Sequence, residues 1–414
     1  MLKKAMIWLS ITLLTLAGCS PSLNNNEDEV VPNEEKSKQQ EKSIVPSYQL
    51  SEENYRTILP YRTSASRGVI TNQVMNRIDI GEMETGLRRL SKEYYDPEKY
   101  FFEEGQYLTS DMLYKWLDRN LTEDQLKEEL NKQVSFLEEN GQSVDEEDKA
   151  EIRKELQLGL NPAIADDESK KQQENNPKYL THILEHNFLK KNEDNTVDLI
   201  GASIGIAMKS DYAFQTETGG ATYHKMIDKE TMLKKGKEIA QTVLERVRKI
   251  EEMSDIPIMF AIYREEDPGS PVPGSYVAKT GVSGGDRQIG DWETVHEENI
   301  LFPSDEGEEK YYDQQQLVMD FGDKIQEYFP NYVGVIGEGF YINEELQKLT
   351  LTIPLEFYGK GEVIGFTQYT YGLVKEMFQD YYDLEIKVKS NEKMESVIYR
   401  NAGEEEPTVH IFDK

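Results

Sequence analysis

Residues 200–208 have the sequence IGASIGIAM, in which large apolar side chains alternate with small residues. Alternation with a period of two is typical of a β-strand, because successive side chains point to opposite faces of a sheet. Apolar residues then recur every three or four positions over residues 239–250, which predicts an amphipathic helix that Thr231 can cap. Alternation returns over residues 256–262. This order of strand, helix and strand predicts an α+β fold.

The same order of patterns returns near the C-terminus. Residues 349–357 alternate, residues 366–377 have a helical spacing, and residues 384–388 alternate again. Two such units favour a structural duplication, with an N-terminal α+β domain over residues 48–312 and a C-terminal α+β domain over residues 313–414. Two unrelated α+β units would give the same order of patterns, so the pattern alone leaves both interpretations open.

The sequence before the first unit is predicted to be helical and rich in loops. Thr122 and Gln125 have the spacing of a capping box, and an apolar stripe follows as far as Leu137, with Gly141 placed to end the helix. A second helix is expected over residues 146–156. Three further features are predicted to be irregular: a polar loop over 166–176, an extended loop over Pro268–Gly290, and an edge or bulged strand at Pro354.

The first eighteen residues have the features of a secretory signal peptide. Lys3 and Lys4 precede an apolar run over residues 5–16, and the small residues Ala17 and Gly18 follow. The apolar run is shorter than the roughly twenty residues that a permanent membrane-spanning helix needs. We therefore expect residues 1–18 to be removed by a signal peptidase during export.

Cys19, directly after this segment, is the only cysteine in the chain, so no intrachain disulfide can form. Leu16-Ala17-Gly18-Cys19 fits the bacterial lipobox, in which the cysteine thiol receives a diacylglyceryl group. We therefore predict a protein on the extracytoplasmic face of the cell membrane, held to membrane lipid through Cys19. The alternatives to lipidation are a cleaved signal that leaves Cys19 as a free terminal cysteine, and a plain membrane anchor. Residues 19–47 are polar and predict a disordered tether.

The composition excludes one class of function and allows a folded core. The chain has a formal net charge of −31, which repels nucleic acid, so no nucleic-acid partner is expected. Its 24 Tyr and 14 Phe are enough for a hydrophobic core. Runs of acidic residues are most simply interpreted as solvated surface.

Two motifs suggest catalytic chemistry. His182, Glu185 and His186 fit H-x-x-E-H, in which two histidines one helical turn apart bind zinc and the glutamate acts as a base. No third ligand can be chosen, and the histidines could equally flank a buried apolar stripe. Gly201-Ala202-Ser203-Ile204-Gly205 matches the nucleophile elbow G-x-S-x-G, but the alternation continues past Ser203 where an elbow needs a sharp turn. We therefore predict no enzymatic activity, no cofactor and no metal, and keep a zinc-dependent hydrolase as the alternative.

Several short stretches, in order along most of the chain, resemble the CamS-type sex-pheromone lipoproteins of Gram-positive bacteria. They are Asn54–Pro60, Gly159–Pro162, Ile204–Met208, Ile256–Tyr263, Ile364–Tyr369 and Val409–Phe412. The resemblance implies an α+β protein with two related repeats and no established enzymatic role for the mature domain.

The resemblance also implies that a short hydrophobic peptide, released from the end of the signal sequence, acts as a mating pheromone toward other bacteria. The corresponding residues here are Thr12, Leu13, Leu14, Thr15, Leu16, Ala17 and Gly18. Thr12 and Thr15 stand where the family's peptide is more apolar. The ligand of the mature domain is not implied by the resemblance, so an envelope or binding role is all that is expected of it.

Overall fold

The computed structural model describes residues 54–192, 196–329, 331–357, 359–391 and 393–413, and the backbone of an antiparallel strand pair formed by β1 (Glu29–Pro32) and β2 (Lys42–Val45). The predicted signal peptide, with Thr12–Gly18, and the predicted lipidation site Cys19 lie outside the described residues. So does the predicted tether, apart from this strand pair. Among the described residues, no helix combines the length and the apolar character that crossing a bilayer requires.

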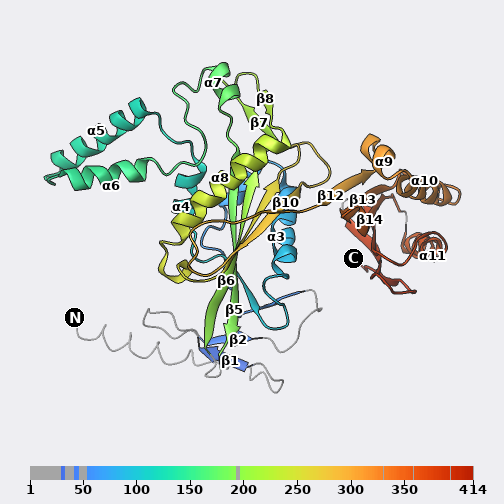
Figure 1. Cartoon of the computed structure of the whole chain (residues 1–414). Coiled ribbons are helices and arrows are strands. Elements are labelled where there is room, and N and C mark those ends of the chain that lie inside the picture. The colour runs from blue at the N-terminus through green and yellow to red at the C-terminus, as the bar shows by residue number, and fades with distance from the viewer. Residues whose placement is uncertain are drawn as a thin grey trace, which may run out of the picture.

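A seven-stranded sheet forms the centre of the first part of the molecule (Figure 1). Helix α8 (Lys229–Val247) packs on one face of the sheet and helix α3 (Arg77–Ser91) on the other, so the central strands are buried on both faces. In spatial order the strands are β11 (Glu293–Thr294), β10 (Ser275–Val282), β9 (Ile258–Arg264), β6 (Val197–Met208), β5 (Leu180–Lys191), β4 (Phe101–Glu104) and β3 (Arg56–Thr57).

The predicted first unit corresponds to β6, α8 and β9. Because β6 and β9 are parallel neighbours, the chain must cross over between them, and α8 is that crossover. Ala202, Ile204 and Ile206 of β6 belong to the core beneath α8. The predicted cap residue was wrong: Asp228 caps α8 by accepting a hydrogen bond from the Thr231 amide, since the helix begins before Thr231.

A six-stranded sheet repeats this arrangement in the second part of the molecule. The parallel strands β14 (Glu345–Pro354) and β15 (Asp383–Ser390) are joined by the crossover helix α11 (Lys360–Met377), as β6 and β9 are joined by α8. The first strand of the sheet, β12 (Glu297–Phe302), precedes residue 313, the predicted start of the C-terminal domain. The sheet also contains β13 (Ile336–Ile342), β16 (Lys393–Arg400) and β17 (Thr408–Ile411), and the helices α9 (Asp305–Lys310) and α10 (Tyr312–Gln326) belong to the same part of the molecule. The predicted α+β class is therefore confirmed.

The two sheets are joined through the side chain of Arg89, at the end of α3. Its guanidinium donates two hydrogen bonds of 2.9 Å to Glu297 of β12 and one of 2.7 Å to Glu82. It also lies 4.3 Å from the centre of the Phe340 ring on β13. Since the Glu297 side chain is almost completely buried, this bidentate pair is shielded from solvent.

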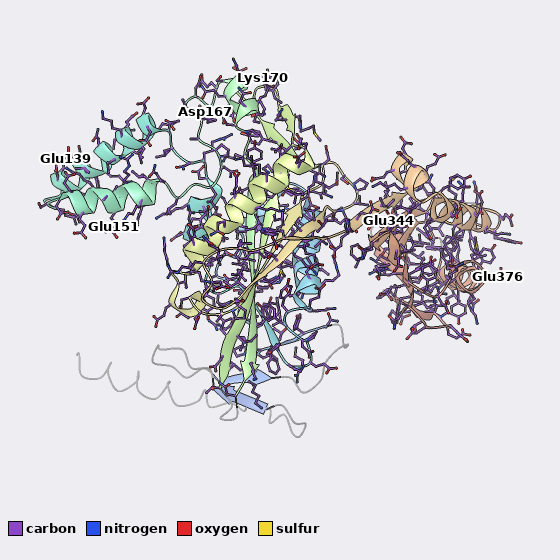
Figure 2. All side chains as sticks on the ribbon, viewed as in Figure 1. Glu139, Glu151, Asp167, Lys170, Glu344 and Glu376 are labelled. Atoms are coloured by element: carbon purple, nitrogen blue, oxygen red, sulfur yellow. The ribbon has the colours of Figure 1, made fainter. Side chains whose placement is uncertain are left out.

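The connection from β4 to β5 contains four helices: α4 (Ser110–Leu117), α5 (Glu123–Glu139), α6 (Glu146–Leu156) and α7 (Lys170–Asn175). Helices α5 and α6 form a hairpin that projects from the body (Figure 1). The predicted capping box at Thr122 and Gln125 is confirmed, and so is the end of α5 before Gly141, which has a φ of 81°. Acidic side chains such as Glu139 and Glu151 cover the hairpin (Figure 2).

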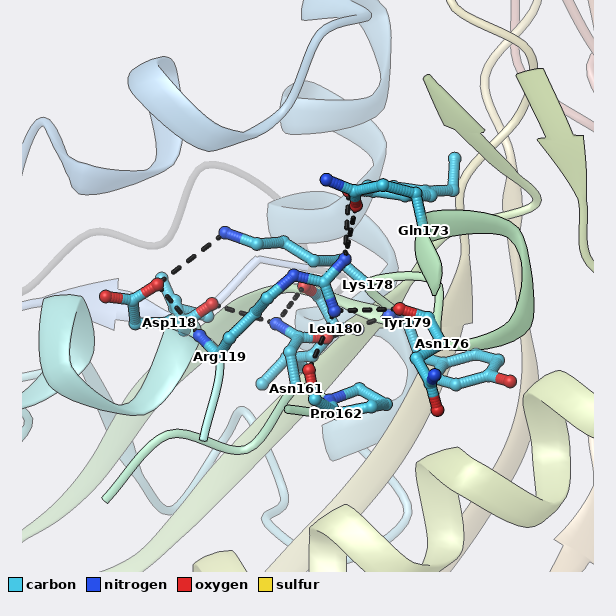
Figure 3. A network of polar contacts seen from close by, with 11 residues as sticks. Asp118, Arg119, Asn161, Pro162, Gln173, Asn176, Lys178, Tyr179 and Leu180 are labelled. Carbon is cyan, nitrogen blue, oxygen red and sulfur yellow. Dashed lines mark hydrogen bonds and ion pairs between the residues drawn. The ribbon is translucent and has the colours of Figure 1, made fainter. Parts of the chain in front are cut away.

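A polar network holds this long connection to the sheet (Figure 3). The buried Asn161 side chain donates to the carbonyls of Leu117 and Leu180 and accepts from the amides of Tyr179 and Leu180. The Arg119 guanidinium donates to four groups, namely the carbonyls of Pro162 and Asn176 and the side chains of Gln173 and Tyr212. Asn161 therefore joins the end of α4 to the first residue of β5.

Three predicted irregular segments differ from the structure. The predicted polar loop over 166–176 contains α7, and the predicted extended loop Pro268–Gly290 contains β10. Pro354 ends β14, which is a central strand and not an edge, although β14 does contain a bulge at Gln347, away from Pro354. Proline is tolerated there because β13 pairs only as far as Thr352, so no partner strand needs the missing amide on that side. The remaining elements are α2 (Val69–Gln73), β7 (Asp211–Phe214), β8 (Tyr223–Met226) and the 3₁₀ turn η1 (Glu251–Met253).

Candidate functional site

A cavity of about 400 Å³ lies against β4 and β5 on the face of the first sheet that α3 covers. We call it the histidine cavity, because His182 and His186 of β5 line it. Phe102 and Glu104 of β4, the first turn of α2, one side of α3 and the loop around Tyr61 complete its walls. The cavity therefore contains the two histidines of the predicted zinc motif.

The alternation of β5 places both histidines on the same face. Along β5, Leu184 follows His182 by two positions and His186 follows Leu184 by two positions. The pairing of β5 with β6 is regular between His182 and Phe188. Glu104 of β4 pairs with His186, so its side chain lies on the same face. The cavity floor thus follows from the strand register alone.

Both imidazole rings are buried and neutral. Each side chain is 2% exposed, and the Nδ1 atom of each has no hydrogen-bond partner among the described residues. Burial lowers the pKa of both to about 3, and the charge of Arg88 lowers that of His186 further. The Phe102 ring meets His186 edge to face, with 4.9 Å between ring centres.

The zinc hypothesis assumed that residues 182–186 form a helix, and this assumption is wrong because they lie in β5. On β5 the two histidines are separated by four residues of strand, about 13 Å, where an i, i+4 pair on a helix would converge. Glu185 points to the opposite face and accepts hydrogen bonds from the amides of Gln106, Tyr107 and Leu108, the last at 2.7 Å. Glu185 contributes to the cavity lining, but its carboxylate is held by these backbone amides and therefore anchors the loop. No group of three metal-binding side chains occurs among the described residues.

The nucleophile elbow is also not formed. Ser203 lies within β6, is completely buried, and shares a hydrogen bond of 2.8 Å with the Ser91 hydroxyl of α3. A Cβ atom at Gly201 would lie only 2.2 Å from the Tyr95 ring, so the glycine provides space for α3 and the loop after it. The alternation that continues past Ser203 in the sequence thus corresponds to a continuous strand.

Besides the buried Glu185, four charged residues line the cavity, and because all four are at least partly exposed they define its mouth: Arg67, Glu84, Arg88 and Glu104. Glu104 accepts hydrogen bonds from the Tyr61 hydroxyl and, at 2.5 Å, from the Ser64 amide. Burial and the charge of Glu104 raise the pKa of Glu84, while Arg88 and Arg67 oppose that shift.

The charges at the mouth thus interact with one another and balance, two positive against two negative. This ring could not be recognised in the sequence, because its members come from three separate segments.

Comparisons with known proteins agree on one family. The profile described as CamS sex pheromone cAM373 precursor matches residues 61–406. The crystal structure of a sex pheromone precursor from Lactobacillus salivarius subsp. salivarius UCC118 is similar, with a TM-score of 0.75, 27% identity, and coverage of 89% of this chain and 98% of that one.

The C-terminal domain of the sex pheromone staph-cAM373 precursor from Staphylococcus aureus is also similar. It has a TM-score of 0.68 and 27% identity, and the match covers 83% of this chain and 100% of that domain. No curated protein sequence matches the chain.

Proposed function

The chain belongs to the CamS family of sex pheromone precursors, and we propose from this membership that it is an extracytoplasmic lipoprotein whose signal sequence yields a pheromone-like peptide. The observation that carries the proposal is the position of Cys19, which directly follows Thr12–Gly18 in a lipobox. A peptidase that hydrolyses the amide bond between Gly18 and Cys19 gives Gly18 a free carboxylate. A second cut, before Thr12, releases the seven-residue peptide.

The folded body is proposed to be non-enzymatic and to serve the cell envelope by binding. Two observations support this. Glu185, the potential base, is occupied by three backbone amides, and Ser203, the potential nucleophile, is buried in the middle of a strand. Membrane lipid on Cys19 and the signal peptidase are the partners expected of the N-terminal segment.

The lipid anchor is tested by substituting Cys19 with alanine in cells supplied with labelled palmitate. Cys19→Ala should lose the label, and the protein should either be released to the medium or remain an unprocessed precursor. Ser20→Ala, one residue further, is the matched control and should keep both label and location. Palmitate labelling of Cys19→Ala at the wild-type level would refute the anchor.

The peptide is tested separately with synthetic Thr-Leu-Leu-Thr-Leu-Ala-Gly. Nanomolar to micromolar peptide should induce a mating response in responder bacteria, while a scrambled peptide of the same composition should not. Equal responses to both peptides, or none to either, would remove the pheromone part and leave the lipid anchor standing.

A further inference from the structure

The histidine cavity has polar groups that nothing in the protein satisfies. Buried polar atoms in folded proteins almost always have a hydrogen-bond partner, because an unpaired one loses its hydrogen bonds to water without replacement. His182 and His186 each leave Nδ1 without a partner among the described residues, and both rings line the same cavity. Both Nδ1 atoms have almost no accessible surface, so a molecule in the cavity meets the remaining edges of the two imidazole rings.

The charged ring at the mouth defines the charges of that molecule. Arg67 and Arg88 form no ion pair with a carboxylate in the part of the chain that the structure describes, and Arg88 lies over the Phe102 ring at 5.4 Å. Glu84 and Glu104 stand beside them. Two cations and two carboxylates around one opening complement a ligand that carries both signs and no net charge.

The inner walls define the rest of the ligand. Ile70 of α2, Ile80 of α3, Phe102 of β4 and Leu184 of β5 give the cavity an apolar lining below the charged mouth. Its volume of about 400 Å³ is at the lower end of the range of small-molecule sites. An apolar side chain fits against these walls, and a peptide amide can hydrogen-bond to a neutral imidazole.

We propose that the histidine cavity binds a short zwitterionic peptide with an apolar side chain. Its carboxylate lies toward Arg67 and Arg88, its ammonium group toward Glu84 and Glu104, and an amide group toward one of the two imidazole rings. The site belongs to the folded body and is independent of lipid on Cys19 and of pheromone activity.

Calorimetric titration of the full chain in detergent tests the proposal with the tripeptide leucyl-alanyl-glycine, a zwitterion with one apolar side chain. The tripeptide should bind with one site per chain. The same peptide acetylated at its N-terminus and amidated at its C-terminus carries no charge and should bind at least tenfold more weakly. Absence of binding by the charged tripeptide, or equal affinity for both forms, would overturn the proposal.

Two substitutions at the mouth connect the affinity to this site. Arg88→Gln and Glu84→Gln should each weaken binding of the tripeptide about tenfold, which corresponds to about 1.4 kcal/mol. Arg153→Gln, on the exposed hairpin far from the cavity, is the matched control and should bind normally. Each variant should keep the wild-type circular dichroism spectrum. Full affinity in a folded Arg88→Gln protein would place the binding elsewhere and refute the assignment.

Discussion

Asn161 provides the sharpest test of how the long connection is held to the first sheet. Its amide makes four hydrogen bonds of 2.8–3.1 Å, two as donor and two as acceptor, which is the full capacity of the group. At about 1 kcal/mol for each bond, Asn161→Ala should lower the free energy of unfolding by about 4 kcal/mol. The partners are backbone groups, and they are left unpaired in a buried site.

Urea unfolding, followed by circular dichroism, measures this loss, and two further variants define its origin. Asn161→Asp keeps both acceptors but presents a carboxylate to two carbonyl groups, so it should also destabilise the fold. Asn72→Ala removes a single exposed hydrogen bond to Tyr114 and should change the free energy of unfolding by less than about 0.5 kcal/mol. A loss below about 1.5 kcal/mol for Asn161→Ala would show that water replaces the amide and would refute the reasoning.

Three other predictions concern stability. Arg89→Met leaves the buried Glu297 carboxylate without its partner, so the free energy of unfolding in urea should fall by about 3–5 kcal/mol, and adding Glu297→Gln should restore part of it. An unchanged free energy of unfolding would contradict a buried ion pair between the two sheets. Gly201→Ala places a methyl group against Tyr95 and should lower the free energy of unfolding by about 1–3 kcal/mol in the same assay. Gly372→Ala, where the glycine has open space around it, should not lower it. Burial holds the pKa of both cavity histidines near 3, below the ordinary 6.5, so the unfolded chain takes up protons first as the pH falls. Stability should therefore fall from about pH 6 to about pH 4 by up to about 1.4 kcal/mol per pH unit for each histidine, and replacing both by glutamine should flatten that slope.

Local signals predicted the elements that form from neighbouring residues. The capping box at Thr122 and the glycine at position 141 define α5 within the chain itself, and α6 occupies the predicted residues 146–156. The crossover units were also predictable, because each combines a strand period with a helix period in a fixed order. Their parallel pairing could then be expected from the connection length.

The structure of residues 180–191 could not be predicted in the same way. β5 is a central strand buried on both faces, so apolar and polar residues do not alternate along it, and H-x-x-E-H is compatible with a helix or a strand. β10 was missed because the surrounding glycines and prolines, typical of a loop, flank a strand that forms only by pairing with β9 and β11. Contacts between distant segments decide both cases.

The α5–α6 hairpin differs from the rest of the molecule in how it is stabilised. Of its side chains only Leu126 is buried, Phe136 is 66% exposed, and the exposed ion pair of Arg153 with Glu123 joins the two helices. Its amide hydrogens should therefore exchange with solvent through opening of the hairpin alone, while the sheets remain closed. A protease should cut first near Gly141, and because the Asn161 network holds the chain beyond the cut, the two fragments should stay associated.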